Sequence, residues 1–318
     1  MFDITAIGEI LIDLTQTGVS ETGIPVYTAF PGGAPANVAV AAARLGAKCA
    51  FIGKVGDDAF GKLLVETVKQ NGVNSDGMVV SEKDNTTLAV VSLQPGGERS
   101  FSFYRKGFAD TMLREDEISE DKLTNTHFLH FGSVSLTDEP SRSATLNCVK
   151  KAKQLNKTVT YDPNYRASLW DSEAEAIAMM KHPLTIVDIL KISDEELPLL
   201  AGTDDPDAGT KKLADEYNIK LILLTLGPRG AFFRFGDLTG QVDTFDVKVA
   251  DTNGAGDTFF GAFLSGMARK NIYDPSQLCE KDIIELVTYA NKAATITTSR
   301  SGAIPAMPTF DEVMNFEA

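Results

Sequence analysis

The chain has 318 residues, of which 43% are hydrophobic and 23% charged, and its formal net charge is −14. This length and composition fit a globular chain with a large core and exclude an intrinsically disordered one. The negative charge opposes binding to nucleic acid and to anionic membranes, and the sequence has neither a basic leader nor an apolar run long enough to cross a bilayer.

Short apolar segments alternate with amphipathic segments along most of the chain. The first third predicts a strand over 4–14, a helix over 34–46, a strand over 49–56 and a helix over 58–72. Gly46 and Gly72 are expected to end these two helices. Later segments predict strands over 126–136, 158–164, 185–193 and 220–227, and a helix over 144–155. Such alternation predicts an α/β fold with a mostly parallel sheet flanked by helices.

Two segments, 15–30 and 86–104, instead alternate with a period of two between turn residues. The second predicts a hairpin with its tip at 95–98. We expect both to form a small β-layer beside the main sheet, within a single domain over 1–318. This layer, over about 13–31 and 86–106, is a candidate lid over a substrate. An edge extension of the sheet or a dimer contact would give the same pattern, and these roles do not exclude one another.

A glycine pair, Gly32 and Gly33, precedes the helix predicted over 34–46, and Asn37 lies in its first turns. Two interpretations are open. The pair forms an ordinary turn into a helix, or it lets a polar, uncharged ligand approach the backbone while Asn37 offers a donor and an acceptor. A sugar would suit the second interpretation.

A second group of small residues, Gly254, Ala255 and Gly256, lies between a half-buried strand predicted over 245–249 and helical spacing over 259–267. Glycine in a helix costs about 1 kcal/mol relative to alanine, so two glycines at a helix start require an offsetting role. Bare backbone N–H groups at the positive end of a helix can hold an anion such as a phosphate.

Asp257 follows this group directly, and again two interpretations are open. The helix dipole stabilises an acidic residue in a first turn by a few tenths of a kcal/mol up to about 1 kcal/mol. A carboxylate beside a bound phosphate is also placed to take a proton from a hydroxyl that attacks the phosphorus. The second interpretation makes Asp257 a general base in phosphoryl transfer.

The segments "GGAPANVA" (32–39) and "DTNGAGDTFFGAFL" (251–264) resemble the two signature motifs of the ribokinase-like (PfkB) family of carbohydrate kinases. The resemblance extends from "IGEILIDL" (7–14) to "ANKAATITTSRSGA" (290–303), and "DPNYRASLW", "KISDEE" and "LLTLGPRGA" are similar to fructokinases within the family. It implies a three-layer α/β fold with a β-sheet lid, and transfer of the γ-phosphoryl group of ATP to a sugar hydroxyl, with fructose becoming fructose 6-phosphate.

The resemblance also implies roles for individual residues. Asp257 matches the catalytic base, and the backbone of Gly254, Ala255 and Gly256 matches the anion hole. The implied sugar side comprises Asp13, Gly32, Gly33, Asn37, Arg105 and Arg166. The two arginines match positions near the sugar and the transferred phosphate, where a guanidinium would offset phosphoryl charge. Taken without the family, each would be an exposed surface arginine.

On the nucleotide side, the resemblance implies Thr225, Gly227, Gly230, Asn291, Asn164 and Lys191. Without the family, the turn around Gly227 is a loop that ends a strand, and Asn291 is a polar residue of a helix. Glu196 matches a glutamate that positions hydrated Mg²⁺, although Ser193 stands where the family motif has asparagine. "SDEEL" also fits a plain helix cap.

A monovalent cation is a further expectation from the resemblance. Family members often bind one beside the anion hole, and this implies K⁺ near Asp251, Ser301 and Gly302. Here Asn253 stands where many relatives have threonine. The resemblance also implies a homodimer formed through the lid strands.

Other functions remain open at this point. A kinase of ribose or of 2-keto-3-deoxygluconate would share the motifs, and so would a catalytically silent sugar-binding relative. A dinucleotide-dependent dehydrogenase is disfavoured, since no Gly-x-Gly-x-x-Gly follows the first strand. Three widely spaced cysteines fit neither a disulfide framework nor a zinc site, so we expect a cytoplasmic protein.

Overall fold

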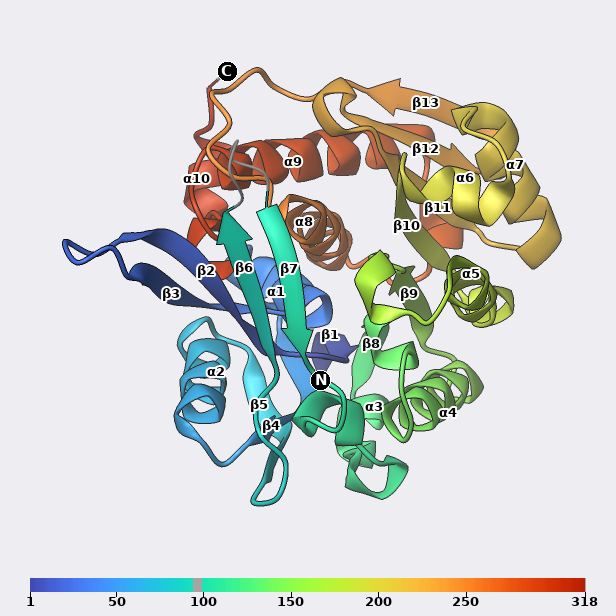
Figure 1. Ribbon diagram of the computed structural model, residues 1–318. Helices are drawn as coiled ribbons and strands as arrows, with labels where there is room; N and C mark the ends of the chain where they lie inside the picture. Colours follow the sequence, from blue (N-terminus) through green and yellow to red (C-terminus); the bar gives the residue numbers. More distant parts are fainter. Residues whose placement is uncertain (94–98, 318) are drawn as a thin grey trace.

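The computed structural model describes residues 1–93 and 99–317, and Figure 1 shows how the elements are arranged. A nine-stranded sheet has the order β13-β12-β11-β10-β9-β8-β1-β4-β5. Its strands are β1 (Phe2–Ile7), β4 (Cys49–Gly56), β5 (Asn74–Ser81), β8 (Thr126–Gly132), β9 (Thr158–Asp162), β10 (Ile189–Ser193), β11 (Leu221–Thr225), β12 (Ala231–Phe235) and β13 (Leu238–Val242). Neighbours from β5 to β11 are parallel, whereas β12 and β13 are antiparallel at one edge.

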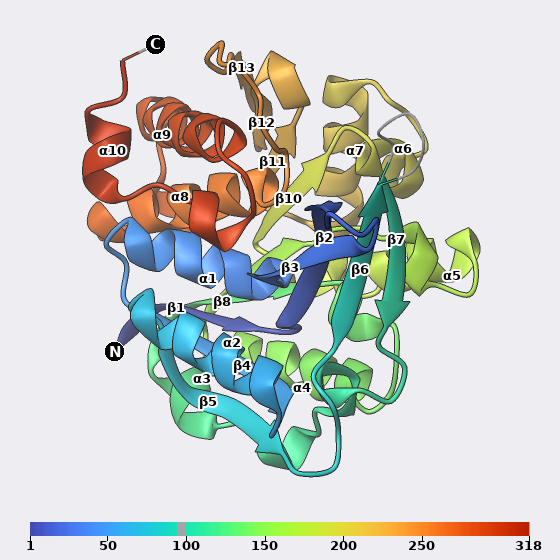
Figure 2. The ribbon, with the colours of Figure 1, turned by 60° about the vertical axis from the view of Figure 1, so that its left-hand side comes forward.

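Helices cover both faces of this sheet, because its strands bury side chains on each side. Ile4 and Ala6 belong to one core cluster and Ile7 to the other. The first cluster includes residues of α1 (Ala34–Arg44), α2 (Ala59–Gln70), α8 (Ala255–Arg269), α9 (Glu280–Thr298) and α10 (Phe310–Met314). The second includes residues of α3 (Glu120–Thr124), α4 (Ser141–Gln154), α5 (Glu173–Lys181), α6 (Glu196–Ala201) and α7 (Pro206–Tyr217). Helix α8 lies between α1 and α9 (Figure 2).

A second, four-stranded sheet has the order β3-β2-β6-β7. It contains β2 (Leu11–Val19), β3 (Pro25–Gly32), β6 (Leu88–Leu93) and β7 (Arg99–Tyr104), and we call it the lid sheet. The hairpin of β2 and β3 projects from the body of the molecule in Figure 1. The predicted fold class, a mostly parallel sheet flanked by helices plus a small sheet, is therefore confirmed. The predicted hairpin tip at 95–98 lies outside the described residues.

The single strand predicted over 4–14 is wrong, because β1 and β2 belong to different sheets. Gly8 separates them with φ +151°, and a Cβ at this position would lie 2.7 Å from Cγ of Pro35. The chain turns from the main sheet into the lid at this glycine, which an L side chain would obstruct.

The strand predicted over 245–249 is also wrong, since this segment pairs with neither sheet. Phe245 and Val247 are half-buried while Val249 is exposed, and the segment packs against other elements: Phe245 contacts Phe316, and the neighbouring Thr244 shares a hydrogen bond with Thr295 of α9. A period-two pattern requires only alternate burial, and here a helix and the C-terminal segment provide it without a strand partner.

The remaining predicted elements are present, most with shorter bounds, although α4 begins at Ser141, three residues before its predicted start. Gly46 and Gly72 follow α1 and α2 with φ of +97° and +78°, as expected of glycines that end helices. The strands predicted over 126–136 and 185–193 are each partly replaced by a 3₁₀ turn, at Val134–Leu136 and Leu184–Ile186. None of the helices in the described residues is long and apolar enough to cross a membrane.

Candidate active site

The candidate site lies where the parallel strands of the main sheet end. The register places Gly132 opposite Asp162 and Ser193 opposite Thr225, so the carboxyl ends of four neighbouring strands are aligned. In open α/β sheets, ligands bind outside the carboxyl ends of the strands. Most of the residues described below come from these ends, from the starts of α1 and α8, and from the lid sheet.

The start of α8 requires small residues for steric reasons. Gly254 has φ +74°, and a Cβ there would lie 2.9 Å from the Cβ of Ala303. A Cβ at Gly256 would lie 2.9 Å from Nζ of Lys191. The glycines therefore allow the first turn of α8 to pack directly against Lys191 and the segment at Ala303.

Backbone amides at this helix start are available to an anion. Helix α8 begins at Ala255, whose N–H donates to the carbonyl of Thr252 at 3.3 Å. Within the described residues, the N–H groups of Gly254 and Gly256 have no hydrogen-bond partner. Two of the three predicted anion-hole amides are thus unpaired at the positive end of a 15-residue helix.

Asp257 lies in the first turn of α8 with only 7% of its surface exposed. Its Oδ2 accepts from Nδ2 of Asn37 at 2.8 Å, and its Oδ1 accepts from Nδ2 of Asn164 at 3.3 Å. Burial raises the pKa of Asp257, while the Asn37 hydrogen bond and the charges of Lys191 and Arg166 oppose the rise. The carboxylate is therefore fixed by amides from two other segments, which dipole stabilisation by itself does not explain.

Asp13 and the glycine pair lie together at the entrance to the lid sheet. A Cβ at Gly32 would overlap the Asp13 carboxylate, and a Cβ at Gly33 would lie 2.5 Å from the carbonyl oxygen of Glu9. Gly33 has φ +111°. Burial raises the pKa of Asp13 to about 6; the charge of Arg166 lowers it and that of Asp257 raises it. Asp13 and Asp257 therefore belong to one electrostatic site.

Asn37 contributes an unusual atom to this site. Its Nδ2 is used by Asp257, but its Oδ1 is buried and has no hydrogen-bond partner. A buried acceptor without a partner is costly unless a ligand or water satisfies it. The atom therefore indicates a missing donor, such as a ligand hydroxyl, directly beside Asp257.

The two predicted arginines have different environments. Arg166 is exposed, and its charge acts on both Asp13 and Asp257. Arg105 is buried, and its guanidinium donates to Asp110 at 2.7 Å, to Thr137, and to the carbonyl of Val134 at 2.9 Å. Contact of Arg105 with a sugar stays a prediction, because its donors are used within the fold.

Lys191 and Asp162 form a buried ion pair under the start of α8, with Nζ and Oδ2 2.9 Å apart. Burial alone would lower the pKa of Lys191, but the charges of Asp162 and Glu196 raise it overall. Lys191 therefore stays cationic beside Gly256. Asp162 was not predicted from the sequence, although an acidic residue at the end of a buried strand is a detectable signal.

Glu196 connects two loops through its carboxylate. Oε1 accepts from the N–H of Tyr165 at 2.7 Å, and Oε2 accepts from the N–H of Ser193 at 2.8 Å and from its hydroxyl at 3.0 Å. The N–H of Glu196 donates back to Oγ of Ser193 at 3.3 Å, so the helix-cap interpretation describes the local geometry. The described residues contain no group of three or more His, Cys, Asp or Glu placed to hold a metal ion. The role of Glu196 toward Mg²⁺ stays a prediction.

The predicted nucleotide turn lies at the end of β11. Thr225 donates to the carbonyl of Ile192 at 3.3 Å, and Gly227 and Gly230 have φ of +56° and +81°. A Cβ at Gly230 would overlap the carbonyl of Val242. Asn291 of α9 is buried and donates to that same carbonyl at 3.0 Å and to the carbonyl of Asp243 at 3.1 Å. The structure therefore brings Gly230 and Asn291 to one short segment after β13.

Asp251 joins the two segments predicted to hold a monovalent cation. Its Oδ1 accepts from the N–H of Asn253 and its Oδ2 from the N–H of Gly302, both at 3.1 Å. Ser301 beside them is exposed. The segments are therefore adjacent, and cation binding there stays a prediction.

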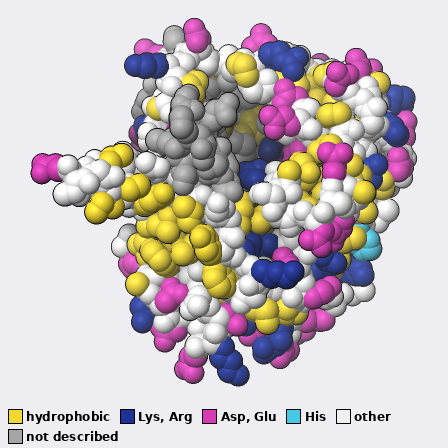
Figure 3. All heavy atoms as spheres, in the orientation of Figure 1, with side chains coloured by type: hydrophobic (Ala, Val, Ile, Leu, Met, Phe, Trp, Pro, Cys, Tyr) yellow, Lys and Arg dark blue, Asp and Glu magenta, His cyan; other side chains and the backbone are white. Residues whose placement is uncertain are grey.

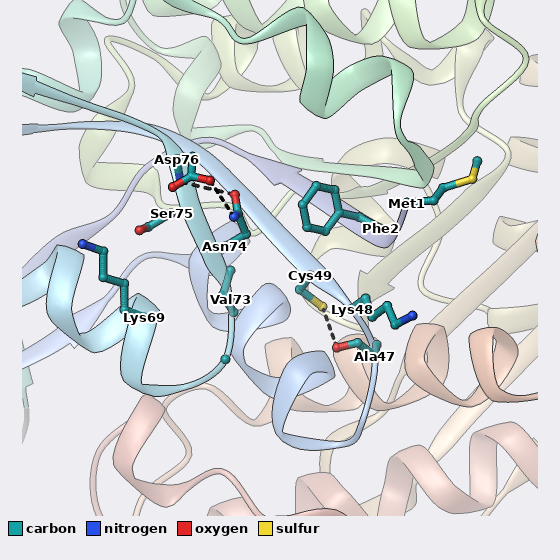
Figure 4. A pocket seen from close by; sticks show the side chains of 11 residues that line it. Met1, Phe2, Ala47, Lys48, Cys49, Lys69, Val73, Asn74, Ser75 and Asp76 are labelled. Atoms are coloured by element: carbon teal, nitrogen blue, oxygen red, sulfur yellow. Dashed lines mark hydrogen bonds between the residues drawn. The ribbon is translucent and has the colours of Figure 1, made fainter.

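A cavity of about 670 Å³ lies at the opposite edge of the sheet. Its lining includes Phe2, Cys49 and Asn74, which are the first residues of β1, β4 and β5 (Figure 4). A second cavity of about 450 Å³ contains Thr126 and Thr158, at the amino ends of β8 and β9. Neither cavity is lined by Asp257 or by any other residue of the candidate site. The candidate site is therefore identified by its unpaired amides and its charged side chains, and not by the volume of a cavity.

Comparisons with known proteins show the family of the chain. The chain matches the family described as pfkB family carbohydrate kinase over residues 1–310. It is 42% identical over 316 residues to probable fructokinase-4 of Arabidopsis thaliana, covering 98% of this chain and 95% of that protein. It is 41% identical over 314 residues to fructokinase-1 of Zea mays, covering 98% and 96%.

Solved structures that resemble this chain also include fructokinases. The fructokinase of Xylella fastidiosa with bound ATP has a TM-score of 0.90 at 32% identity, covering 98% of this chain and 97% of that one. The fructokinase of Vibrio cholerae O395 bound to fructose, ADP and calcium has a TM-score of 0.87 at 33% identity, covering 99% of each chain. From its fold, its site and these matches, the chain belongs to the pfkB family of carbohydrate kinases.

Proposed function

We propose that this carbohydrate kinase is an ATP-dependent fructokinase that forms fructose 6-phosphate and ADP. The observation that carries the proposal is the buried Asp257 carboxylate beside two unpaired amides at the start of α8. A base and an anion site this close together suit attack of a hydroxyl on a phosphoryl group. Relatives with 42% and 41% identity that are named fructokinases support fructose as the acceptor.

Asp257 takes the proton of the attacking hydroxyl while the new O–P bond forms and the bond to the leaving ADP oxygen breaks. Asn37 and Asn164 hold its two oxygens, so the carboxylate needs no reorientation. The unpaired Oδ1 of Asn37 accepts from another sugar hydroxyl, and Asp13 accepts from a further one. These contacts fix the sugar, and orientation of the reactants supplies part of the rate enhancement.

The N–H groups of Gly254 and Gly256 bind the phosphoryl group as negative charge develops on it. Lys191 beside Gly256 and the exposed Arg166 add two cations to a chain whose net charge is −14. The Gly227 turn and the segment held by Asn291 are proposed to contact the rest of the nucleotide.

Mg²⁺ would neutralise charge on the ATP phosphates when bound. The described residues fit a hydrated ion held mainly by the nucleotide, because Glu196 already accepts three hydrogen bonds and would contact the ion through water. K⁺ is proposed to bind near Asp251, Ser301 and Gly302. The calcium-bound and potassium-bound fructokinase structures of Vibrio cholerae O395 support a cation in such enzymes.

We also propose a homodimer formed through the lid sheet, and the cytoplasm as the place of action. Apolar side chains are exposed on the β2–β3 hairpin, among them Val19, Ile24 and Val26, and Figure 3 shows hydrophobic side chains gathered on this side of the molecule. Such a patch is typical of a protein interface. Three cysteines without a disulfide suit a reducing compartment.

An acceptor screen tests the proposal. Purified protein is given ATP and Mg²⁺ with fructose, glucose, ribose and 2-keto-3-deoxygluconate, with and without K⁺, and ADP release is measured. We expect the highest kcat/KM with fructose. A higher kcat/KM with another acceptor would reassign the substrate, and no ADP release with any sugar would indicate a catalytically silent relative.

A further inference from the structure

Glu9 is a buried carboxyl at the point where the chain leaves the main sheet for the lid sheet. It lies between the end of β1 at Ile7 and the start of β2 at Leu11, and 3% of its surface is exposed. An acidic side chain is rarely buried to this degree without partners. The mechanism described above does not use it.

Glu9 contacts the sugar-side turn through both its backbone and its side chain. A Cβ at Gly33 would lie only 2.5 Å from the carbonyl oxygen of Glu9. The Oε1 atom of Glu9 accepts a hydrogen bond from the N–H of Ala34 at 3.1 Å. Gly33 is the N-cap of α1 and has no side chain that could accept this amide. Glu9 therefore supplies, from another segment, an acceptor for one of the N-terminal amides that a helix leaves unpaired.

Glu9 also faces charged groups of the lid side. The positive charge of Arg105, directly after β7, lowers the pKa of Glu9, and the negative charge of Asp110 raises it. The hydroxyl of Ser135 donates to its Oε2 at 3.5 Å. Burial raises the pKa of Glu9 to about 7, so its charge changes near neutral pH.

We propose that Glu9 is a positioning residue that holds the Gly32–Gly33 turn for the sugar. The inference rests on the proposed sugar-binding role of that turn. Because Asn37 lies one turn into the same helix, a displaced α1 start would also move the amide that holds Asp257. Glu9 itself touches neither the reacting oxygen nor the phosphoryl group.

The test uses two variants and a matched control. Glu9→Ala removes the acceptor for Ala34, whereas Glu9→Gln keeps an acceptor oxygen of the same size and loses the charge. We expect Glu9→Ala to raise KM for the sugar roughly 10- to 100-fold with KM for ATP nearly unchanged, and Glu9→Gln to restore most of the loss.

Asp188→Asn is the control, since Asp188 is an equally buried carboxylate that pairs with Lys153 at the opposite edge of the sheet. Hydrogen exchange of the unliganded proteins gives a second readout. We expect faster exchange over 32–37 in Glu9→Ala, and no local change there in Asp188→Asn. Exchange and sugar KM in Glu9→Ala equal to those of the control would overturn the inference. If no sugar is phosphorylated, the proposed function fails, while the exchange result still decides the role of Glu9.

Discussion

Asp257 is subject to two opposing effects on its proton affinity. Burial raises its pKa, and the Asn37 hydrogen bond together with the charges of Lys191 and Arg166 lowers it. A base must be deprotonated before reaction and yet accept a proton during it, so an upward shift of its pKa favours proton transfer to it. The side-chain amides of Asn37 and Asn164 hold the carboxylate through hydrogen bonds and place no positive charge beside it.

Asp257→Asn should lower kcat by roughly 10²- to 10⁴-fold, the usual contribution of a general base. The amide keeps the size of the side chain, so KM for the sugar should change little. Steady-state kinetics with fructose measure both parameters. Turnover close to that of the wild type would remove Asp257 from its role.

Glu9 should make stability depend on pH. Its pKa is raised from 4.5 to about 7 in the folded protein, chiefly by burial, so the folded state binds this proton more tightly than the unfolded chain. The stabilising contribution is complete below about pH 4.5 and is lost as pH rises through 7, by up to roughly 3 kcal/mol. Urea unfolding at pH 5 and pH 8 should show a larger loss for the wild type than for Glu9→Gln. Equal losses would show that Glu9 does not titrate in this range.

At the scale of elements, the start of α8 combines steric and electrostatic requirements. Gly254 needs a left-handed conformation and close contact with Ala303, while its N–H and that of Gly256 stay unpaired. Unpaired amides and the helix dipole give the first turn a partial positive charge. The same geometry that excludes side chains therefore exposes the donors.

Gly254→Ala should reduce both stability and turnover. The left-handed conformation costs a non-glycine residue about 1–2 kcal/mol, and the contact with Ala303 shifts the amides. Gly72→Ala is the matched control, because Gly72 has a similar φ of +78° and open space around it. Thermal unfolding should show a loss in both variants, and steady-state kinetics a fall in kcat in Gly254→Ala. An equal kcat in the two variants would contradict an anion-binding role for this turn.

At the scale of the whole molecule, two sheets meet beside the site. Asp13 comes from the lid sheet and Asp257 from a helix that packs on the main sheet, yet the charge of Asp257 raises the pKa of Asp13. Such an arrangement suits enclosure of a substrate away from water.

Ile24→Asp combined with Val26→Glu should abolish the proposed dimer, because both side chains are exposed on the β2–β3 hairpin. Light scattering should show a dimer for the wild type and a monomer for the variant. Val80→Glu is the control, since Val80 is also exposed but lies on β5 of the main sheet. A wild-type monomer, or a variant that stays dimeric, would exclude this interface.

Local sequence determined the elements and the chemistry available to the protein. Alternating apolar and amphipathic segments predicted the parallel sheet, and glycines predicted the ends of α1 and α2. These features depend on near neighbours in the chain, so a single sequence contains them. The two signature motifs also predicted Asn37 and Asp257, which the structure joins at 2.8 Å.

Only the tertiary structure decided which segments share a sheet and which polar atoms stay unpaired. The change of sheet at Gly8 depends on contact with Pro35, and the absence of a strand at 245–249 depends on packing against Phe316. Likewise, Glu9 accepts from an amide 25 residues away, and Oδ1 of Asn37 has no partner. Burial and pairing of this kind arise from residues distant in sequence, so no local pattern specifies them.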